Sequence, residues 1–172
     1  MNSEKITLHR GDITKLHVDA IVNAANAQLT PGGGVGNAIH AAAGPELREE
    51  CAKLPACREG DAVITGAYRL PAKHVIHAVG PSWHGGKRHE AEKLARTYQR
   101  AFALAAEHDV HTIAFPAISC GTYSYPVDEA ARIAIDETLR ALRTNPKLEH
   151  VTFALFTPEV HAAFAEALAA RG

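Results

Sequence analysis

Residues 18–43 read VDAIVNAANAQLTPGGGVGNAIHAAA, an apolar run followed by an asparagine- and glycine-rich segment and then by a helical pattern. The apolar run Val18–Val22 is typical of a buried strand. The glycines Gly32–Gly34 are expected to lie outside regular structure, and the helix is expected at Val35–Ala43. A strand, a loop and a helix in this order are typical of an α/β domain with a parallel sheet.

The same alternation continues over most of the chain. We predict strands at Ile6–Leu8, Asp61–Thr65, His74–Val79, Thr112–Phe115 and Val151–Phe156, and helices at Glu90–Ala106, Pro126–Leu142 and Pro158–Ala170. The longer helices repeat apolar residues every three or four positions. Because no linker, internal repeat or low-complexity segment divides the chain, residues 1–172 are expected to form one α/β domain with a largely parallel sheet.

Composition excludes several classes of protein. The 172 residues are 47% hydrophobic and 22% charged, which argues against disorder. A net charge of −1 disfavours a nucleic-acid partner, and the apolar stretches are too short to span a bilayer. Cys51, Cys57 and Cys120 show no Cys-x-x-Cys spacing, which disfavours both disulfides and zinc. We therefore expect a cytoplasmic protein with no metal and no membrane segment.

The glycine run is the strongest functional signal. Glycines before a helix let backbone N–H groups converge on an anion, and the helix dipole adds partial positive charge. There is no Gly-Lys-Ser/Thr sequence, which excludes a P-loop, and Asn37 stands where a dinucleotide fingerprint needs glycine. The run therefore predicts phosphate contact, with a flexible turn as the alternative.

Other candidate ligand contacts lie in loops that follow predicted strands, where ligands bind in parallel α/β sheets. Ile118–Tyr125 offers backbone donors and the aromatic faces of Tyr123 and Tyr125, which are suited to cover a ribose or base, although a tyrosine in a loop is more often a packing residue. Asp12 is suited to accept a hydrogen bond from an amine or to cap a turn, and Asn23 and Asn26 to contact ribose hydroxyls or to form a turn. Cys120 lacks an identifiable base to activate it.

Several motifs together resemble the macrodomain family, and most closely its MacroD-type branch, which includes bacterial O-acetyl-ADP-ribose deacetylases. They are Gly11-Asp12-Ile13-Thr14, Val22-Asn23-Ala24-Ala25-Asn26, Gly32-Gly33-Gly34-Val35, Ala38-Ile39-His40, Ala43-Gly44, Val75-Ile76-His77-Ala78-Val79-Gly80-Pro81 and Phe115-Pro116-Ala117-Ile118-Ser119. The resemblance covers nearly the whole chain. It implies a three-layer α/β/α domain with a mixed, largely parallel sheet and a cleft that binds ADP-ribose without a cofactor.

The resemblance also implies residue roles. Asp12 would hold the adenine amine beside Ile13, Asn26 would contact the distal ribose, and Tyr123 would lie against that sugar. The diphosphate would lie between Gly33, Gly34 and Val35 on one side and Ser119, Gly121 and Thr122 on the other. Asn23, Gly36 and Cys120 complete the expected ligand-binding set. The implied ligands are ADP-ribose, O-acetyl-ADP-ribose and mono-ADP-ribosylated proteins, bound by a monomer.

Two departures from the MacroD-type pattern bear on catalysis. That pattern has Asp-Gly after the valine of the glycine loop, where this chain has Gly36-Asn37, and Gly-Val-Tyr-Gly where this chain has Gly121-Thr122-Tyr123-Ser124. Without the aspartate, hydrolysis of ester-linked ADP-ribose would rely on Asn26 and Asn37 to position water and on the substrate's own phosphate to activate it. The alternatives are a non-catalytic ADP-ribose reader and, less favoured by the net charge, binding to RNA or poly(ADP-ribose).

Overall fold

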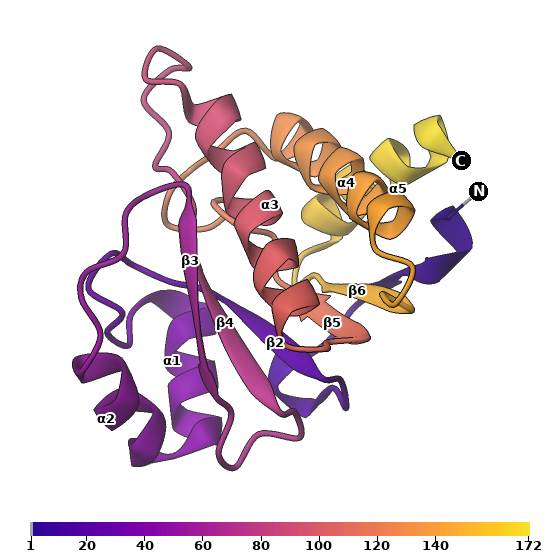
Figure 1. The fold of residues 1–172 in the computed structure, drawn as a ribbon. Helices are drawn as coiled ribbons and strands as arrows, with labels where there is room; N and C mark the ends of the chain where they lie inside the picture. Colours follow the sequence, from indigo (N-terminus) through magenta and orange to yellow (C-terminus); the bar gives the residue numbers. More distant parts are fainter. Residues whose placement is uncertain (1) are drawn as a thin grey trace.

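A computed structural model describes residues 2–172 as a six-stranded sheet flanked by five α-helices (Figure 1). The strands are β1 (Ile6–His9), β2 (Ala20–Ala24), β3 (Asp61–Gly66), β4 (His74–Val79), β5 (Thr112–Phe115) and β6 (His150–Ala154). The α-helices are α1 (Gly33–Ala43), α2 (Pro45–Ala52), α3 (Glu90–Glu107), α4 (Val127–Thr144) and α5 (Pro158–Arg171), and short 3-10 helices occupy Ser3–Lys5 and Ile13–Lys15.

The sheet is mixed and largely parallel, as predicted. Its strand order is β1-β6-β5-β2-β4-β3, and only β3 with β4 forms an antiparallel pair. Parallel neighbours need crossover connections, whereas the antiparallel pair is joined directly by a short loop. As a result the carboxyl ends of β1, β6, β5, β2 and β4 all lie along one edge of the sheet.

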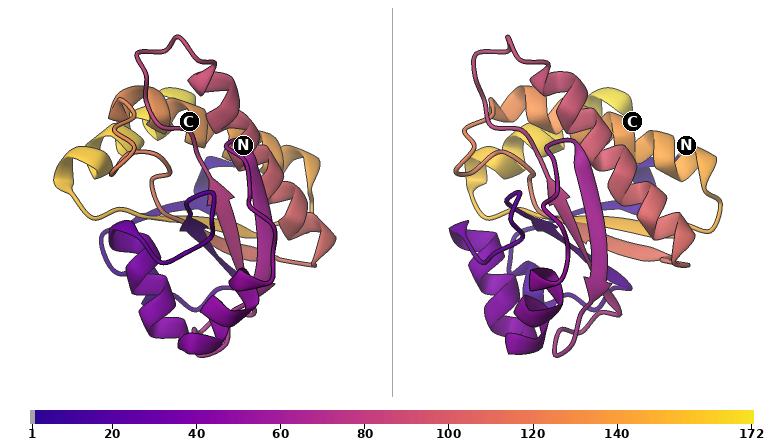
Figure 2. Two further views of the ribbon diagram at one scale, coloured as in Figure 1. Left: turned by 90° about the vertical axis from the view of Figure 1, so that its left-hand side faces the viewer. Right: turned by 60° about the vertical axis from the view of Figure 1, so that its left-hand side comes forward.

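Helices cover both faces of the sheet, which confirms the three-layer arrangement. Figures 1 and 2 show α1 and α2 on one face and α3, α4 and α5 on the other. Each face has its own apolar core: Ile21, Ile39 and Leu47 belong to the cluster under α1 and α2, and Phe115 and Phe153 to the larger one opposite. Within residues 2–172 no helix is long and apolar enough to cross a bilayer.

The start of α1 differs from the prediction. The helix begins at Gly33 instead of Val35, so two of the three glycines form its first turn. The first turn tolerates glycine because its N–H groups have no acceptor within the helix. Gly33 also has a φ of +68°, in the left-handed region that favours glycine.

Other element boundaries also needed correction. The prediction missed α2, whose eight residues are too few to show a clear period; Pro45 at its first position is the one local signal. Strand β2 occupies Ala20–Ala24, two residues later than expected. The last strand ends at Ala154, which leaves Phe156 outside the sheet, where the residue is 58% exposed.

We expect Phe115→Ala to lower the free energy of unfolding by about 3–5 kcal/mol, because it leaves a cavity in the larger core. The Phe115 ring is fully buried and its centroid lies 5.0–5.6 Å from those of Tyr98, Phe102 and Phe153. Urea titration followed by circular dichroism measures the change. Phe156→Ala, the same deletion at an exposed position, should cost less than about 1 kcal/mol. Equal losses in the two variants would contradict this description of the core.

Candidate functional site

A cleft of about 470 Å³ lies at the edge where the parallel strands end. It is lined by segments that follow β2, β4, β5 and β6. The lining residues are Ala24, Ala25, Asn26, Gly32–Gly36, Gly80, Pro116, Ala117, Ser119–Tyr123, Ala154–Thr157 and Val160. Its size is within the range of pockets that hold small organic ligands.

The N-terminus of α1 forms the first wall. Gly32 precedes the helix without any side-chain cap, so no side chain occupies the N–H groups of the first turn. A Cβ atom at Gly34 would meet no atom within 4 Å, which means that the backbone there is open toward the cleft. Uncapped N–H groups at a helix start form a ready site for an anion.

Residues Ser119–Tyr123 form the second wall. Ser119 is buried, with a φ of +67°, and its hydroxyl donates a hydrogen bond to the carbonyl oxygen of Pro81 at 2.7 Å. Gly121 is open on its Cβ side. A Cβ atom at Gly33 would lie 3.7 Å from Thr122 Oγ1, so the two walls face each other at close range.

The cleft has no charged side chain among the described residues that line it. An anion bound there would therefore be held by backbone N–H groups and by the dipole of α1. Tyr123 is the one tyrosine in the lining, and burial together with the negative charge of Glu59 raises its pKa. Tyr123 is consequently a neutral phenol at physiological pH.

Asn26 lines the cleft in a preset orientation. Its Nδ2 donates to the carbonyl oxygen of Thr30 at 3.0 Å, and its Oδ1 accepts from the N–H of Thr30 at 3.1 Å. A Cβ atom at Gly32 would approach Asn26 Nδ2 to 3.3 Å, so glycine leaves room for the amide. Asn26 thus presents a fixed polar group next to the first wall.

Asn23 points beneath α1 and is not among the cleft-lining residues. Its Nδ2 lies 3.1 Å from Nδ1 of His77, whose Nε2 lies 3.0 Å from the hydroxyl of Thr65. Since that hydroxyl donates to the carbonyl oxygen of Gly66, it accepts from His77 Nε2, and Nδ1 accepts from Asn23. Burial, with a smaller effect of His40, lowers the pKa of His77 to about 3. His77 is therefore a neutral, hydrogen-bonded core residue.

Three further predicted site residues also lie outside the lining of the cleft. Asp12 Oδ1 accepts hydrogen bonds from the N–H and hydroxyl of Thr14 at 2.9 and 2.7 Å, and these bonds lower its pKa. Asp12 thus has the turn-capping role that was its alternative assignment. Ile13 is 1% exposed and packs in the core beneath α1. Asn37 is exposed on α1, and the structure does not bring it into the cleft.

The part of the cleft that follows β6 was not predicted from the sequence. Leu155, Phe156, Thr157 and Val160 line it, and Phe156 and Tyr68 are the two exposed large hydrophobic residues among those described. Leu155 N–H donates to the carbonyl oxygen of His9, so this segment lies beside the end of β1 and the Asp12 turn. Because the apolar run that ends at Phe156 is typical of a strand, the sequence gives no sign that this residue lies outside the sheet and is exposed.

Cys120 lines the cleft with a largely buried thiol. Burial raises its pKa to about 12. The described residues that line the cleft include no histidine or carboxylate that could take its proton, and the thiolate is the nucleophilic form. Cys120 is therefore a packing residue of the second wall.

Comparison with known proteins places these features in a family context. Residues 22–134 match the family model described as "Macro domain". The chain is 51% identical over 172 residues to a protein of Enterobacter cloacae subsp. cloacae named O-acetyl-ADP-ribose deacetylase. The match covers 98% of this chain and 96% of that protein. It is 50% identical over 167 residues to a macro domain-containing protein of Mesorhizobium japonicum, covering 97% and 95% of the two chains.

Solved structures show the same fold. The Oceanobacillus iheyensis macrodomain with ADP has a TM-score of 0.90 and 37% identity, and the match covers 95% of this chain and 90% of that one. The Trypanosoma brucei macrodomain in complex with ADP-ribose has a TM-score of 0.89 and 37% identity, with 95% and 69% covered.

We expect Cys120 to resist alkylation by iodoacetamide at neutral pH. With a pKa of about 12, fewer than roughly one thiol in 10⁴ is ionised at pH 7.5. Because the pKa is raised, the labelling rate should grow about tenfold per pH unit above neutrality. Peptide mass spectrometry measures the labelling, and the urea-unfolded protein is the control. Labelling of the folded protein at the rate of a free thiol would contradict this assignment.

Proposed function

Because this chain belongs to the macro domain family and carries the cleft described above, we propose that it binds ADP-ribose and hydrolyses ester-linked ADP-ribose. The observation that carries the proposal is the pair of facing walls, each with an open glycine and neither with a charged side chain. A diphosphate is an anion of the size and charge that backbone N–H groups at a helix start accommodate. The relatives named for ADP-ribose and its acetyl ester support the same ligand.

The adenosine part would occupy the end of the cleft near Phe156. Phe156 is exposed and lies on the segment that follows β6, next to the end of β1. An exposed aromatic face beside a nucleotide site is suited to stack on a base. Asp12 follows β1 at this same end, where its carboxylate is suited to accept from the adenine amine while it caps the turn. Ile13 supports that turn from the core.

The distal ribose would lie near Asn26 and Tyr123, at the other end of the two walls. In the reaction, water attacks the acyl carbon, the ester C–O bond breaks, and the carboxylic acid and the ribose hydroxyl are released. No carboxylate or imidazole lines the cleft among the described residues, so a phosphate oxygen of the substrate would take the proton from the water and pass it to the ribose oxygen as the ester C–O bond breaks. Asn26, held by Thr30, would orient the water or the ribose.

A non-catalytic reader of ADP-ribose is the second candidate. The observation in its favour is the same lack of a general base, since losing such a group costs about 10²–10⁴-fold in rate. Calorimetric titration with ADP-ribose tests the binding that both candidates share. Release of acetate from O-acetyl-ADP-ribose separates them: turnover above the uncatalysed rate supports the hydrolase, and tight binding without turnover supports the reader.

We expect Phe156→Ala to weaken ADP-ribose binding by about tenfold or more, because base stacking on an aromatic side chain contributes roughly 1–3 kcal/mol. Tyr68→Ala is the matched control: this residue is 47% exposed and hydrogen-bonded to Glu50, away from the cleft-lining residues. Calorimetry on both variants gives the two dissociation constants. Equal affinities in Phe156→Ala and the wild type would remove Phe156 from the proposed base site.

We expect Gly36→Asp to raise the rate of acetate release by about 10²–10⁴-fold, because it supplies a general base. A Cβ atom at Gly36 meets only Asn23 Oδ1, at an ordinary distance of 3.7 Å, so the first side-chain atom fits without a shift of the backbone. Gly36→Asn, which has the same shape and no basic oxygen, should leave the rate unchanged. An equal gain in both variants would show that shape, and not proton transfer, limits the wild-type protein.

A further inference from the structure

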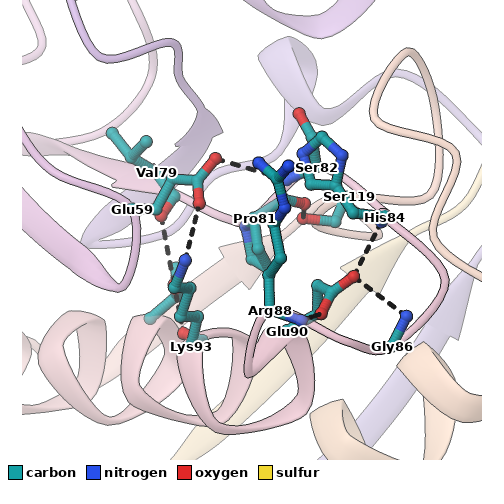
Figure 3. Close-up of polar contacts among 11 residues, drawn as sticks. Glu59, Val79, Pro81, Ser82, His84, Gly86, Arg88, Glu90, Lys93 and Ser119 are labelled. Atoms are coloured by element: carbon teal, nitrogen blue, oxygen red, sulfur yellow. Dashed lines mark hydrogen bonds and ion pairs between the residues drawn. The ribbon is translucent and has the colours of Figure 1, made fainter.

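The loop formed by residues 80–89 connects β4 to α3 and projects from the molecule beside the second wall (Figures 1 and 3). Its tip is exposed from His84 to His89. Glu90 follows directly as the first residue of α3 and is only 1% exposed. An exposed residue, His89, is therefore followed directly by a buried carboxylate, that of Glu90.

The Glu90 carboxylate is bonded to the backbone of this loop (Figure 3). Its Oε2 accepts from the N–H groups of His84 and Gly86 at 2.7 and 3.0 Å, and its Oε1 accepts from the N–H of Arg88 at 2.7 Å. Burial alone would favour the protonated acid, but these hydrogen bonds lower the pKa of Glu90 to about 2. The group is thus a carboxylate at neutral pH.

The base of the same loop contacts the second wall of the cleft. The carbonyl oxygen of Pro81 accepts from Ser119 Oγ at 2.7 Å, and the N–H of Trp83 donates to the carbonyl oxygen of Tyr123 at 2.9 Å. A Cβ atom at Gly80 would lie 2.3 Å from Ser119 Oγ, so the two segments touch with no space between them. A shift of the loop would therefore be transmitted to Ser119 and Tyr123.

A further polar contact of the loop, at Ser82, is weaker. The N–H of Ser82 reaches Glu59 Oε2 at 3.4 Å, and Glu59 Oε1 pairs with Lys93 at 3.4 Å (Figure 3). Glu59 and Lys93 are partly exposed, and such pairs contribute little. The buried charge-assisted bonds of Glu90 are the stronger constraint on the loop.

From these contacts we infer that Glu90 is a positioning residue for the ADP-ribose cleft: its carboxylate holds the 80–89 loop, and the loop holds the second wall through Pro81 and Trp83. The inference rests on the proposed function for its ligand. Glu90 differs from an ordinary acid at a helix start, because such an acid would interact with the first turn of its own helix. Here the three donors His84, Gly86 and Arg88 lie upstream of α3.

The experiment compares Glu90→Ala and Glu90→Gln with Glu92→Ala, an exposed acid in the same turn of α3 that pairs with His89 at the surface. We expect the ADP-ribose dissociation constant to rise about tenfold or more in Glu90→Ala, because the wall is no longer preorganised. Glu90→Gln keeps one carbonyl acceptor and should lose less. Glu92→Ala should bind like the wild type.

Formate gives a readout that a general loss of stability would not produce. In Glu90→Ala the three N–H groups face a carboxylate-sized cavity, and millimolar formate should restore part of the affinity for ADP-ribose. The same formate should have no effect on the wild type or on Glu92→Ala. Binding within twofold of the wild type in folded Glu90→Ala, with fast amide hydrogen exchange at His84, Gly86 and Arg88, would overturn the inference. If Glu90→Ala does not fold, the same criterion applies to Glu90→Gln.

Amide chemical shifts distinguish failure of this inference from failure of the proposed function. If the wild type does not bind ADP-ribose, the proposed function fails, but the coupling is still measured by NMR without ligand. The amide signals of Ser119–Tyr123 should then shift in Glu90→Ala and stay in place in Glu92→Ala. Unchanged signals in Glu90→Ala would overturn the coupling itself.

Discussion

Parallel pairing of β1, β6, β5, β2 and β4 is the constraint on which the site depends. It brings five strand ends to one edge, and the segments that leave four of these strands line the cleft directly. The turn after the fifth, β1, lies against them through the bond between Leu155 and His9. No single segment could enclose a nucleotide sugar. The sheet therefore determines where the cleft lies, and the short segments after its strands determine which groups line the cleft.

Within this cleft, a bound anion would be held by backbone N–H groups, because no charged side chain is among the described residues that line it. Gly34 and Gly121 leave the main chain uncovered on the Cβ side, while Ser119 adopts a left-handed conformation and donates a hydrogen bond to the carbonyl oxygen of Pro81. Backbone donors cannot be moved by a rotamer change, so their placement is set by whatever supports the loop behind them. The buried carboxylate of Glu90, outside the cleft lining, is such a support because it accepts three hydrogen bonds from the 80–89 loop. The polar group beneath α1 is placed in the same way, since Thr65 and His77 together orient the amide of Asn23.

Much of the layered fold could be predicted from local patterns, because α3 and α4 repeat their apolar residues with a clear helical period. The glycine run and the loop after β5 were also recognisable, since glycine clusters between elements have few other uses. Helix α2 was missed because eight residues give too little periodicity. Phe156 and Glu90 were missed for a different reason: an aromatic ring at the end of an apolar run and an acid at a helix start both look ordinary. Their roles depend on the neighbours that the tertiary structure provides.

The position of β1 has a consequence for how the chain folds as it is synthesised. This strand lies at an edge of the sheet and pairs only with β6, so Ile6 meets Val151 across a separation of most of the chain. β1 cannot find its partner until the last strand has left the ribosome. Contacts between residues so far apart in sequence slow the final step of folding. Until β6 is available, the edge of β5 that pairs with it in the folded protein would accordingly stay exposed in the nascent chain.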